Sequence, residues 1–128
     1  MRYLLAALFF MTALTSKAQD TPTLTKATIE AEFPGGRPAW TQFLNKNLQY
    51  PDAAINKEIQ GDVIVQFQID EQGNVSDVKV LSGPKKGGLR EEAIRMIRIS
   101  GKWKPAIRNE KEVKAIKKET ISFRLSVG

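Results

Sequence analysis

The 128-residue sequence predicts an α+β domain of two layers, in which a three-stranded antiparallel sheet is covered on one face by two helices. Two observations favour this fold class. Three segments alternate apolar and polar residues with the period of two that strands covered on one face show. Two other segments repeat apolar residues every three or four positions, as amphipathic helices do. A chain of this length is expected to form one domain.

The first helix is expected after the turn residues 33–36, because Pro38 suits a first helical position. Its apolar residues recur at i, i+3, i+4 and i+8. They are Trp40, Phe43, Leu44 and Leu48. Pro51 ends this helix and holds Tyr50 in an extended conformation. Asp52 is then expected to cap a short helical segment.

A β-hairpin follows, and its first strand has the clearest pattern in the chain. From Gly61 onward, one face carries Val63, Val65, Phe67 and Ile69. Residues 70–74 form the turn, with a glycine available for positive φ. The return strand covers residues 75–82 with Val78 and Val80 inward. Val75 is out of phase with them, which indicates a bulge or a late strand start.

The second main helix is expected to begin at Leu89, after the loop at 83–88, and Gly101 ends it. Glu91 and Arg95 are placed for an i,i+4 ion pair, and Trp103 is expected in the core behind the helix. After a polar turn at 109–112, Val113 is expected to begin the last strand. The apolar face of that strand carries Ile121, Phe123, Leu125 and Val127.

The order of the strands follows from the direction of the chain. The helix after the hairpin returns the chain along the sheet, so the last strand runs antiparallel to the first. A purely antiparallel sheet must then have the order second, first, last. The last strand is therefore expected at an edge of the sheet.

Residues 1–18 have the pattern of a signal peptide. Arg2 precedes an uncharged run over residues 3–15, and Ser16-Lys17-Ala18 offers small residues for cleavage. The alternative is an inner-membrane anchor, although the run is shorter than the roughly 20 apolar residues of a spanning helix. The protein is expected in the periplasm, and contact with the membrane is expected only if residues 3–15 are retained. Residues 19–32 are polar and are expected to form a flexible lead to a domain at 33–128.

Composition excludes several classes of function. The chain has no Cys and no His, so it can build no disulfide, no thiolate nucleophile, no His-based triad and no zinc site of the usual kind. The net charge of +6 falls to +4 if Arg2 and Lys17 leave with the signal peptide. An exported protein does not meet genomic DNA, so the basic residues are interpreted as a solvated surface. No cofactor, metal or nucleic-acid partner is expected.

Carboxylates are the remaining route to catalysis. Asp70 and Glu71 lie at a hairpin tip, and Glu91 and Glu92 are expected on an exposed helix face. None is placed in a cleft that would raise its pKa, as a general acid requires. The protein is therefore not expected to be an enzyme.

The edge of the last strand is the strongest candidate for a binding surface, because its unpaired backbone groups must be either protected or used. Four charged residues lie along it. They are Lys114, Lys117, Lys118 and Glu119. Such charges can block pairing with another chain, yet a partner peptide can still add a strand there. The pattern leaves these two interpretations open.

Several segments together resemble the TonB C-terminal domain family. In chain order they are Tyr50-Pro51 with Ala54, Gly61 to Ile69 with Asp70 and Gly73, Val78 and Val80, Leu89 and Ala93, Trp103-Lys104-Pro105-Ala106, and Ile121 with Phe123. The start at Phe33-Pro34-Gly35-Gly36, with Phe43-Leu44 and Asn47-Leu48, is similar to a common variant of the family. The resemblance covers roughly residues 33 to 125.

The resemblance implies a non-enzymatic periplasmic module that acts in TonB-dependent transport. In that family the TonB box of an outer-membrane receptor adds as a strand beside the last strand of the domain. Carried over, the docking edge runs from Val113 to Ser122, with Tyr50 and Pro51 near it. The residues expected to contact the peptide along this edge are Val113, Lys114, Ile116, Lys118, Thr120 and Ser122.

A second hypothesis uses the same edge differently. The domain would be an envelope scaffold that pairs with itself, as a homodimer, or with another protein, without coupling to the proton-motive force. Full-length transducers of the family carry a membrane helix and a long Pro-rich spacer, whereas the lead at 19–32 has one proline.

Overall fold

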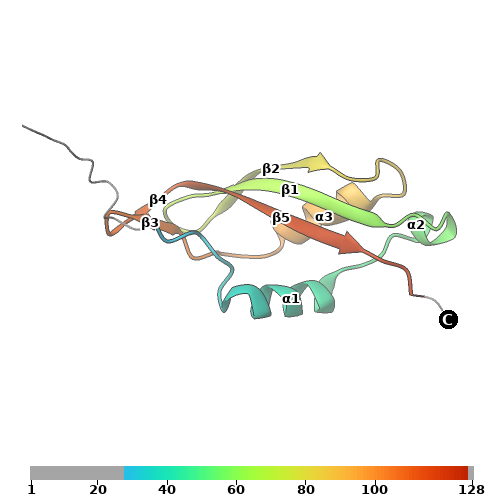
Figure 1. Cartoon of the computed structure of the whole chain (residues 1–128), viewed down its shortest axis with the longest axis horizontal. Coiled ribbons are helices and arrows are strands. Elements are labelled where there is room, and N and C mark those ends of the chain that lie inside the picture. Colours follow the sequence, from blue (N-terminus) through green and yellow to red (C-terminus); the bar gives the residue numbers. More distant parts are fainter. Residues whose placement is uncertain (1–27, 127–128) are drawn as a thin grey trace, which may run out of the picture.

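The computed structural model of the chain describes residues 28–126. Its elements, in chain order, are α1 (Gly36–Asn47), α2 (Asp52–Asn56), β1 (Gly61–Ile69), β2 (Val75–Ser82), α3 (Leu89–Arg98), β3 (Ala106–Arg108), β4 (Lys111–Val113) and β5 (Ala115–Phe123) (Figure 1). The expected signal peptide at 1–18 and residues 19–27 of the expected lead lie outside the described residues.

The main sheet has the order β2-β1-β5, and both pairings are antiparallel. This confirms the predicted fold class and strand order. β1 and β5 pair without interruption from Gly61 opposite Phe123 to Ile69 opposite Ala115. β5 therefore lies at an edge of the sheet, as expected.

The β1–β2 pairing is less regular. Its register shifts twice, between Ile64 and Val65 and between Gln66 and Gln68, and each shift leaves an extra residue on β2. At the second shift Asp77 has a positive φ of 51°. The phase break predicted at Val75 is therefore a bulge, since β2 begins at Val75 itself.

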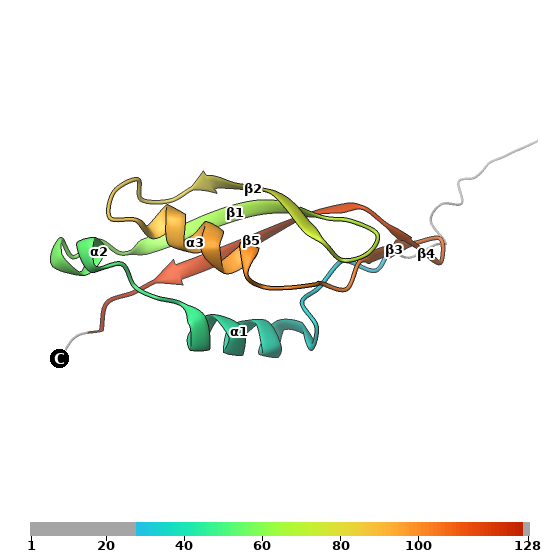
Figure 2. The ribbon, with the colours of Figure 1, turned by 180° about the vertical axis from the view of Figure 1, so that it is seen from behind.

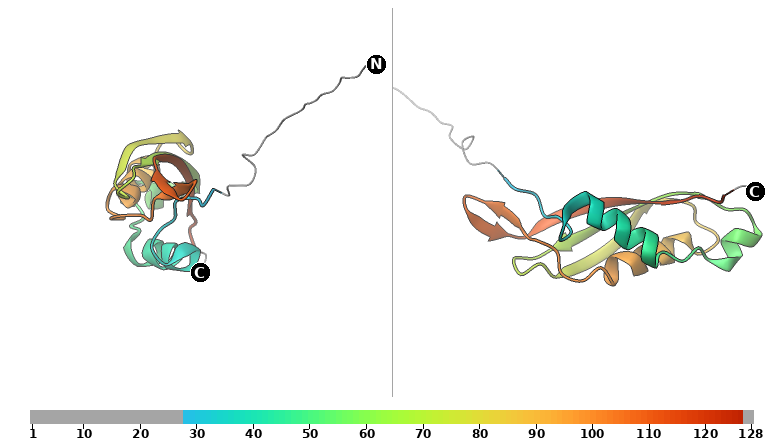
Figure 3. Two further views of the ribbon diagram at one scale, coloured as in Figure 1. Left: turned by 90° about the vertical axis from the view of Figure 1, so that its left-hand side faces the viewer. Right: turned by 90° about the horizontal axis from the view of Figure 1, so that it is seen from below.

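The two main helices lie on the same side of the sheet but in different places. Figure 2 and the view from below in Figure 3 show α3 against β1 and β2, whereas Figure 1 shows α1 along the side of β5 that faces away from β1. α1 thus runs beside the free edge of the sheet.

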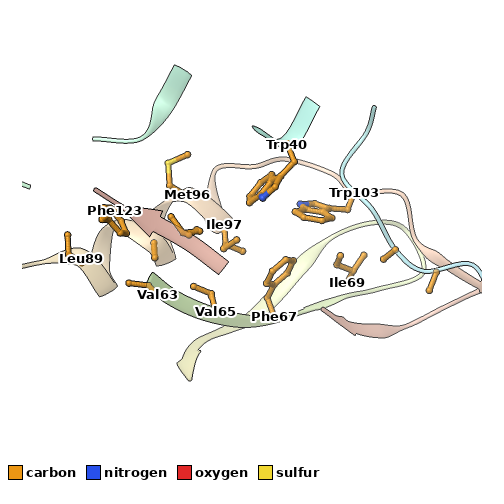
Figure 4. Close-up of a cluster of buried hydrophobic side chains, with 14 of the residues drawn as sticks. Trp40, Val63, Val65, Phe67, Ile69, Leu89, Met96, Ile97, Trp103 and Phe123 are labelled. Atoms are coloured by element: carbon orange, nitrogen blue, oxygen red, sulfur yellow. The ribbon is translucent and has the colours of Figure 1, made fainter. Parts of the chain in front are cut away.

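The core lies between the sheet and the helices and includes an aromatic cluster (Figure 4). Trp103, expected in the core, is 3% exposed, and its ring centroid lies 5.2 Å from those of both Trp40 and Phe67. Phe33 packs on both tryptophans. Trp40 therefore fastens α1 to the rest of the molecule through aromatic packing. Aromatic pairs at such distances stabilise beyond simple burial of their area.

The segment before the last strand differs from expectation. The polar turn predicted at 109–112 is narrower, because only Asn109 and Glu110 have positive φ, and β3 and β4 pair as a short hairpin around them. Val113 ends β4 and does not begin the last strand, which starts at Ala115 and stops at Phe123, before Leu125. Strands of three residues are too short to show a period of two.

Two smaller expectations near the helices are also corrected. Asp52 is the first residue of α2 and not its cap, since Pro51 occupies the cap position and no side chain caps the helix. The last residues of the expected lead pair with the β3 segment. Ile29 exchanges backbone hydrogen bonds with Ile107, as does Glu32 with Lys104.

Gly73 is a position where the fold leaves no room for a side chain. Its φ is +88°, and a Cβ there would lie 2.1 Å from the carbonyl oxygen of Trp103. Gly101 has a similar φ of +80°, but nothing lies within 4 Å of its Cβ position. We expect Gly73→Ala to lower the free energy of unfolding by about 3 kcal/mol and Gly101→Ala by about 1 kcal/mol. Urea unfolding followed by circular dichroism measures both, and equal losses would show that the contact with Trp103 is unimportant.

Candidate functional site

The outer edge of β5 is the candidate site, because β1 occupies only its inner edge. Within residues 28–126, no strand pairs with β5 on the side away from β1. Along β5, exposed and covered side chains alternate. The covered residues face the helices, and the exposed residues point to the open face of the sheet.

The structure brings together most of the residues predicted for the docking edge. Four of them are exposed and share the open face of β5. They are Ile116, Lys118, Thr120 and Ser122. Lys114 joins β4 to β5, and Val113 is the half-buried last residue of β4. The predicted segment is therefore continuous in the chain, although it spans two strands.

Tyr50 lies at the Phe123 end of β5 and packs against that end of the strand. Its hydroxyl donates a 2.5 Å hydrogen bond to the backbone oxygen of Ile59. Its ring meets the ring of Phe123 edge to face, with centroids 5.6 Å apart. These contacts hold the last residue of β5 against the segment before β1. Tyr50 therefore helps to position the end of the strand.

Pro51 is not brought to the edge of β5. It lines a hollow of about 360 Å³ at the start of α3, together with Gly88, Glu91 and Arg95. Tyr50 lines the same hollow, so the Tyr50-Pro51 pair stays together there, while the tyrosine ring also meets Phe123 of β5.

Glu92 was expected on an exposed face, but the structure buries it to 8% exposure. Its carboxylate accepts two hydrogen bonds of 2.8 Å from Arg95 and one of 2.7 Å from the backbone N–H of Gln49. Arg95 also donates to the carbonyl oxygen of Asn47, and the hydrogen bond to Glu92 is the main cause of its raised pKa. The expected Glu91–Arg95 pair is therefore replaced by Glu92–Arg95, which ties α3 to the end of α1.

Glu119 was expected to be one of the charges that protect the edge, but it is only 5% exposed. Both of its carboxylate oxygens accept hydrogen bonds from Arg37 of α1, at 2.9 and 3.2 Å. The hydrogen bond and the charge of Glu119 raise the pKa of the Arg37 guanidinium. This ion pair connects α1 directly to β5, whereas the aromatic packing of Trp40 fastens the helix to Trp103 and Phe33.

A groove of about 310 Å³ lies between α1 and the edge of β5, and we call it the α1–β5 groove. Its lining residues are Arg37, Trp40, Thr41, Leu44, Asn45, Leu48, Thr120, Ile121 and Ser122. The sequence pattern placed Leu44 and Leu48 on the apolar face of this helix, and in the structure both are half-buried and line the groove. The sequence did contain one signal of the buried ion pair, because Glu119 is a charge in phase with the apolar face of Ile121 and Phe123.

The open face of the sheet carries a polar network at the Phe123 end of β5. The Ser122 hydroxyl donates a 2.7 Å hydrogen bond to Asp62 on β1, and Arg124 donates to the same carboxylate oxygen at 2.9 Å. A shallow hollow of about 390 Å³ lies on the same face towards the Ala115 end of β5, and Gln66, Gln68 and Ile116 contribute to it.

The part of the chain that the structure describes offers neither a cluster of metal ligands nor a helix that could span a membrane. No three Asp, Glu, His or Cys side chains among residues 28–126 gather where they could hold a metal ion. Over the same residues, no helix has the length and hydropathy needed to cross a bilayer.

Comparison with known proteins agrees with this geometry. The family model of the Gram-negative bacterial TonB protein C-terminal region matches residues 46–125, more than half of the chain. The chain belongs to the TonB C-terminal family. This TonB-family domain is also similar to the NMR solution structure of the TonB C-terminal domain of Helicobacter pylori. The TM-score is 0.56 at 25% identity, over 70% of this chain and 79% of that one. A search of curated proteins found no match.

The Arg37–Glu119 pair of the TonB-family domain gives a stability prediction. We expect Arg37→Met to lower the free energy of unfolding by about 1–2 kcal/mol, because it leaves a buried carboxylate without its cation while water still reaches the place of the exposed arginine. The double variant Arg37→Met/Glu119→Met should recover most of this loss. Urea unfolding tests both, and a double variant less stable than the single one would contradict the interpretation.

The network at Asp62 gives a pH prediction. The hydrogen bond from Ser122, with a contribution from Arg124, lowers the pKa of Asp62 below its ordinary value of 3.8. Because the pKa is lower in the folded state, the carboxylate stabilises the fold above about pH 4, and this contribution is lost as the pH falls through the lowered pKa. We expect Ser122→Ala to raise the pKa of Asp62, as followed by NMR titration of its carboxyl carbon. Thr120→Ala, on the same face, is the control that should leave it unchanged.

Proposed function

We propose that this TonB-family domain is a non-enzymatic module that binds an extended peptide by adding it as a strand to β5. The proposed partner is the TonB box of an outer-membrane TonB-dependent receptor, and the proposed location is the periplasm, reached through the signal peptide at residues 1–18. The observation that carries the proposal is the straight edge of β5, which pairs with β1 from Ala115 to Phe123 without a register shift. A strand edge of this kind presents its backbone groups at regular spacing to an incoming chain.

The comparison of the two sheet edges supports β5 over β2. β2 is interrupted by two register shifts, and Asp77 within it has a positive φ. Bulges disturb the ladder of donors and acceptors and are a known protection of sheet edges against pairing. β5 has no such interruption, so an added strand would find its regular hydrogen-bond partners only there.

The side chains of β5 suit such a contact. Ile116 is 59% exposed on the open face, where it would pack beside an added strand. Thr120 and Ser122 are short, so they leave the backbone of the strand accessible. The basic residues Lys114, Lys117 and Lys118 gather in the first half of the segment and would favour a peptide that carries acidic residues there.

The test is an NMR titration of isotope-labelled protein with synthetic peptides from the N-terminal segments of TonB-dependent receptors. We expect the largest amide shifts along residues 115–123 and small shifts along 75–82, because hydrogen bonds would form only at the β5 edge. The same peptide with a central proline is the control, since proline removes a donor from the added strand.

Two results would count against the proposal. Binding that shifts β2 and leaves β5 unchanged would place the peptide at the wrong edge. Shifts of β5 that depend on protein concentration without any peptide would favour the alternative of a self-pairing envelope scaffold.

A further inference from the structure

One wall of the α1–β5 groove is formed by β5 and the other by the helix α1. Strand addition to β5 does not by itself require the helix wall. The β5 side of the groove is made by three consecutive residues, 120–122. Side chains alternate along a strand, so three consecutive residues line one groove only when it runs along the edge of that strand. The opposite wall is one face of α1, from Arg37 to Leu48. An added strand would lie about 4.8 Å from β5 and would therefore run between β5 and this helix.

The helix wall is held in place by two contacts already described. Trp40 packs on Trp103 in the core, and Arg37 forms its two hydrogen bonds with Glu119. The Trp40–Trp103 contact is apolar and buried. The Arg37–Glu119 contact lies at the end of the groove where α1 begins. These contacts hold α1 in place, and Figure 1 shows that the helix runs beside β5.

The chemistry of the helix wall is uncharged. Leu44 and Leu48 are half-buried and present aliphatic surface, while Thr41 and Asn45 are exposed and polar without charge. Arg37 is the one charged residue that lines the groove, and Glu119 already neutralises it. The lysines of the edge lie before Glu119 in the chain, outside the lining of the groove. A charged side chain pointing at α1 would therefore lose water without gaining a partner.

We propose that α1 selects the peptide that adds to β5, and that Thr41, Leu44, Asn45 and Leu48 favour uncharged aliphatic side chains at the alternate positions that face the helix. This inference rests on the proposed function and adds a specificity surface to it. Nearly all of this surface lies before residue 46, where the match to the family model begins. Membership of the family therefore does not supply it.

A single extended peptide fits this place better than a second copy of the chain. Each copy has its own α1 beside the edge of β5, so pairing two β5 edges would bring two helices, each about 10 Å wide, against the same joined strands. A strand from a partner fills the groove without that conflict. The occupant is therefore a peptide strand with neutral side chains towards α1.

The experiment compares two capped peptides, one of alternating valine and threonine and its twin with lysine in place of each valine. Their dissociation constants are measured by NMR titration of the β5 amides. We expect the unchanged protein to prefer the valine peptide. Asn45→Asp and Thr41→Asp should each reduce this preference about fivefold, because a carboxylate facing the strand gains an exposed ion pair with lysine.

The matched control is Gln42→Asp, which adds the same charge at an exposed position of α1 that does not line the groove. We expect it to change the preference by less than about twofold, since a distant exposed charge is screened. Leu44 and Leu48 are left intact because they also pack against the core.

The outcomes separate this inference from the proposed function. If the peptides shift the β5 amides but Asn45→Asp behaves like Gln42→Asp, α1 does not select the peptide and the inference alone is wrong. If neither peptide shifts β5, both are wrong. Analytical ultracentrifugation measures whether the protein forms dimers. If Asn45→Asp changes the fraction of dimer, a second copy of the chain occupies the groove, and the choice of a peptide as occupant is wrong.

Discussion

The packing of Trp103 is the interaction on which the arrangement of the molecule depends. Its backbone N–H donates to Gly73 in the β1–β2 turn, and its indole N–H donates to Ser100 at the end of α3. Its ring meets Phe67 of β1 on one side and Trp40 of α1 on the other. One side chain thus joins the hairpin, both helices and the sheet, and it sets the place of α1 beside the edge of β5. Without it, α1 would keep its ion pair with Glu119, the hydrogen bond from Arg95 to Asn47 and the packing of Phe33 on Trp40, but not its direct contact with the centre of the core.

The two edges of the sheet have opposite properties, and this asymmetry gives the domain one usable side. β2 is bent by its bulges, whereas β5 is straight and is bounded by a helix along part of its length. A straight edge without protection invites unspecific pairing, including aggregation. In this domain α1 narrows the approach, so the same helix that completes the core also limits which chains reach the edge.

Sequence patterns predicted the sheet and its order because β1 and α3 have long, clean periodicities, and because chain direction leaves few antiparallel orders. They failed for strands too short to show a period, and for ion pairs between residues far apart in the chain. The β3–β4 hairpin has three residues in each strand, and the burial of Glu92 and Glu119 depends on Arg95, Gln49 and Arg37. Two of these, Gln49 and Arg37, are distant from their glutamates in the chain. A sequence pattern predicts that a glutamate is exposed when it does not show the residue that pairs with it. The α1 wall was missed for the same reason, since apolar periodicity shows that Leu44 and Leu48 face inward but not that a groove passes beside them.

The pairing of residues 29–32 with the β3 segment also determines how the domain would carry mechanical load. Tension that reaches the domain at residue 28 would act first on four backbone hydrogen bonds, two between Ile29 and Ile107 and two between Glu32 and Lys104. The β1–β5 ladder takes no part in this contact, since it joins residues 61–69 to residues 115–123. These four bonds would therefore be the first to break under such a pull, and breaking them would leave the β1–β5 pairing unchanged.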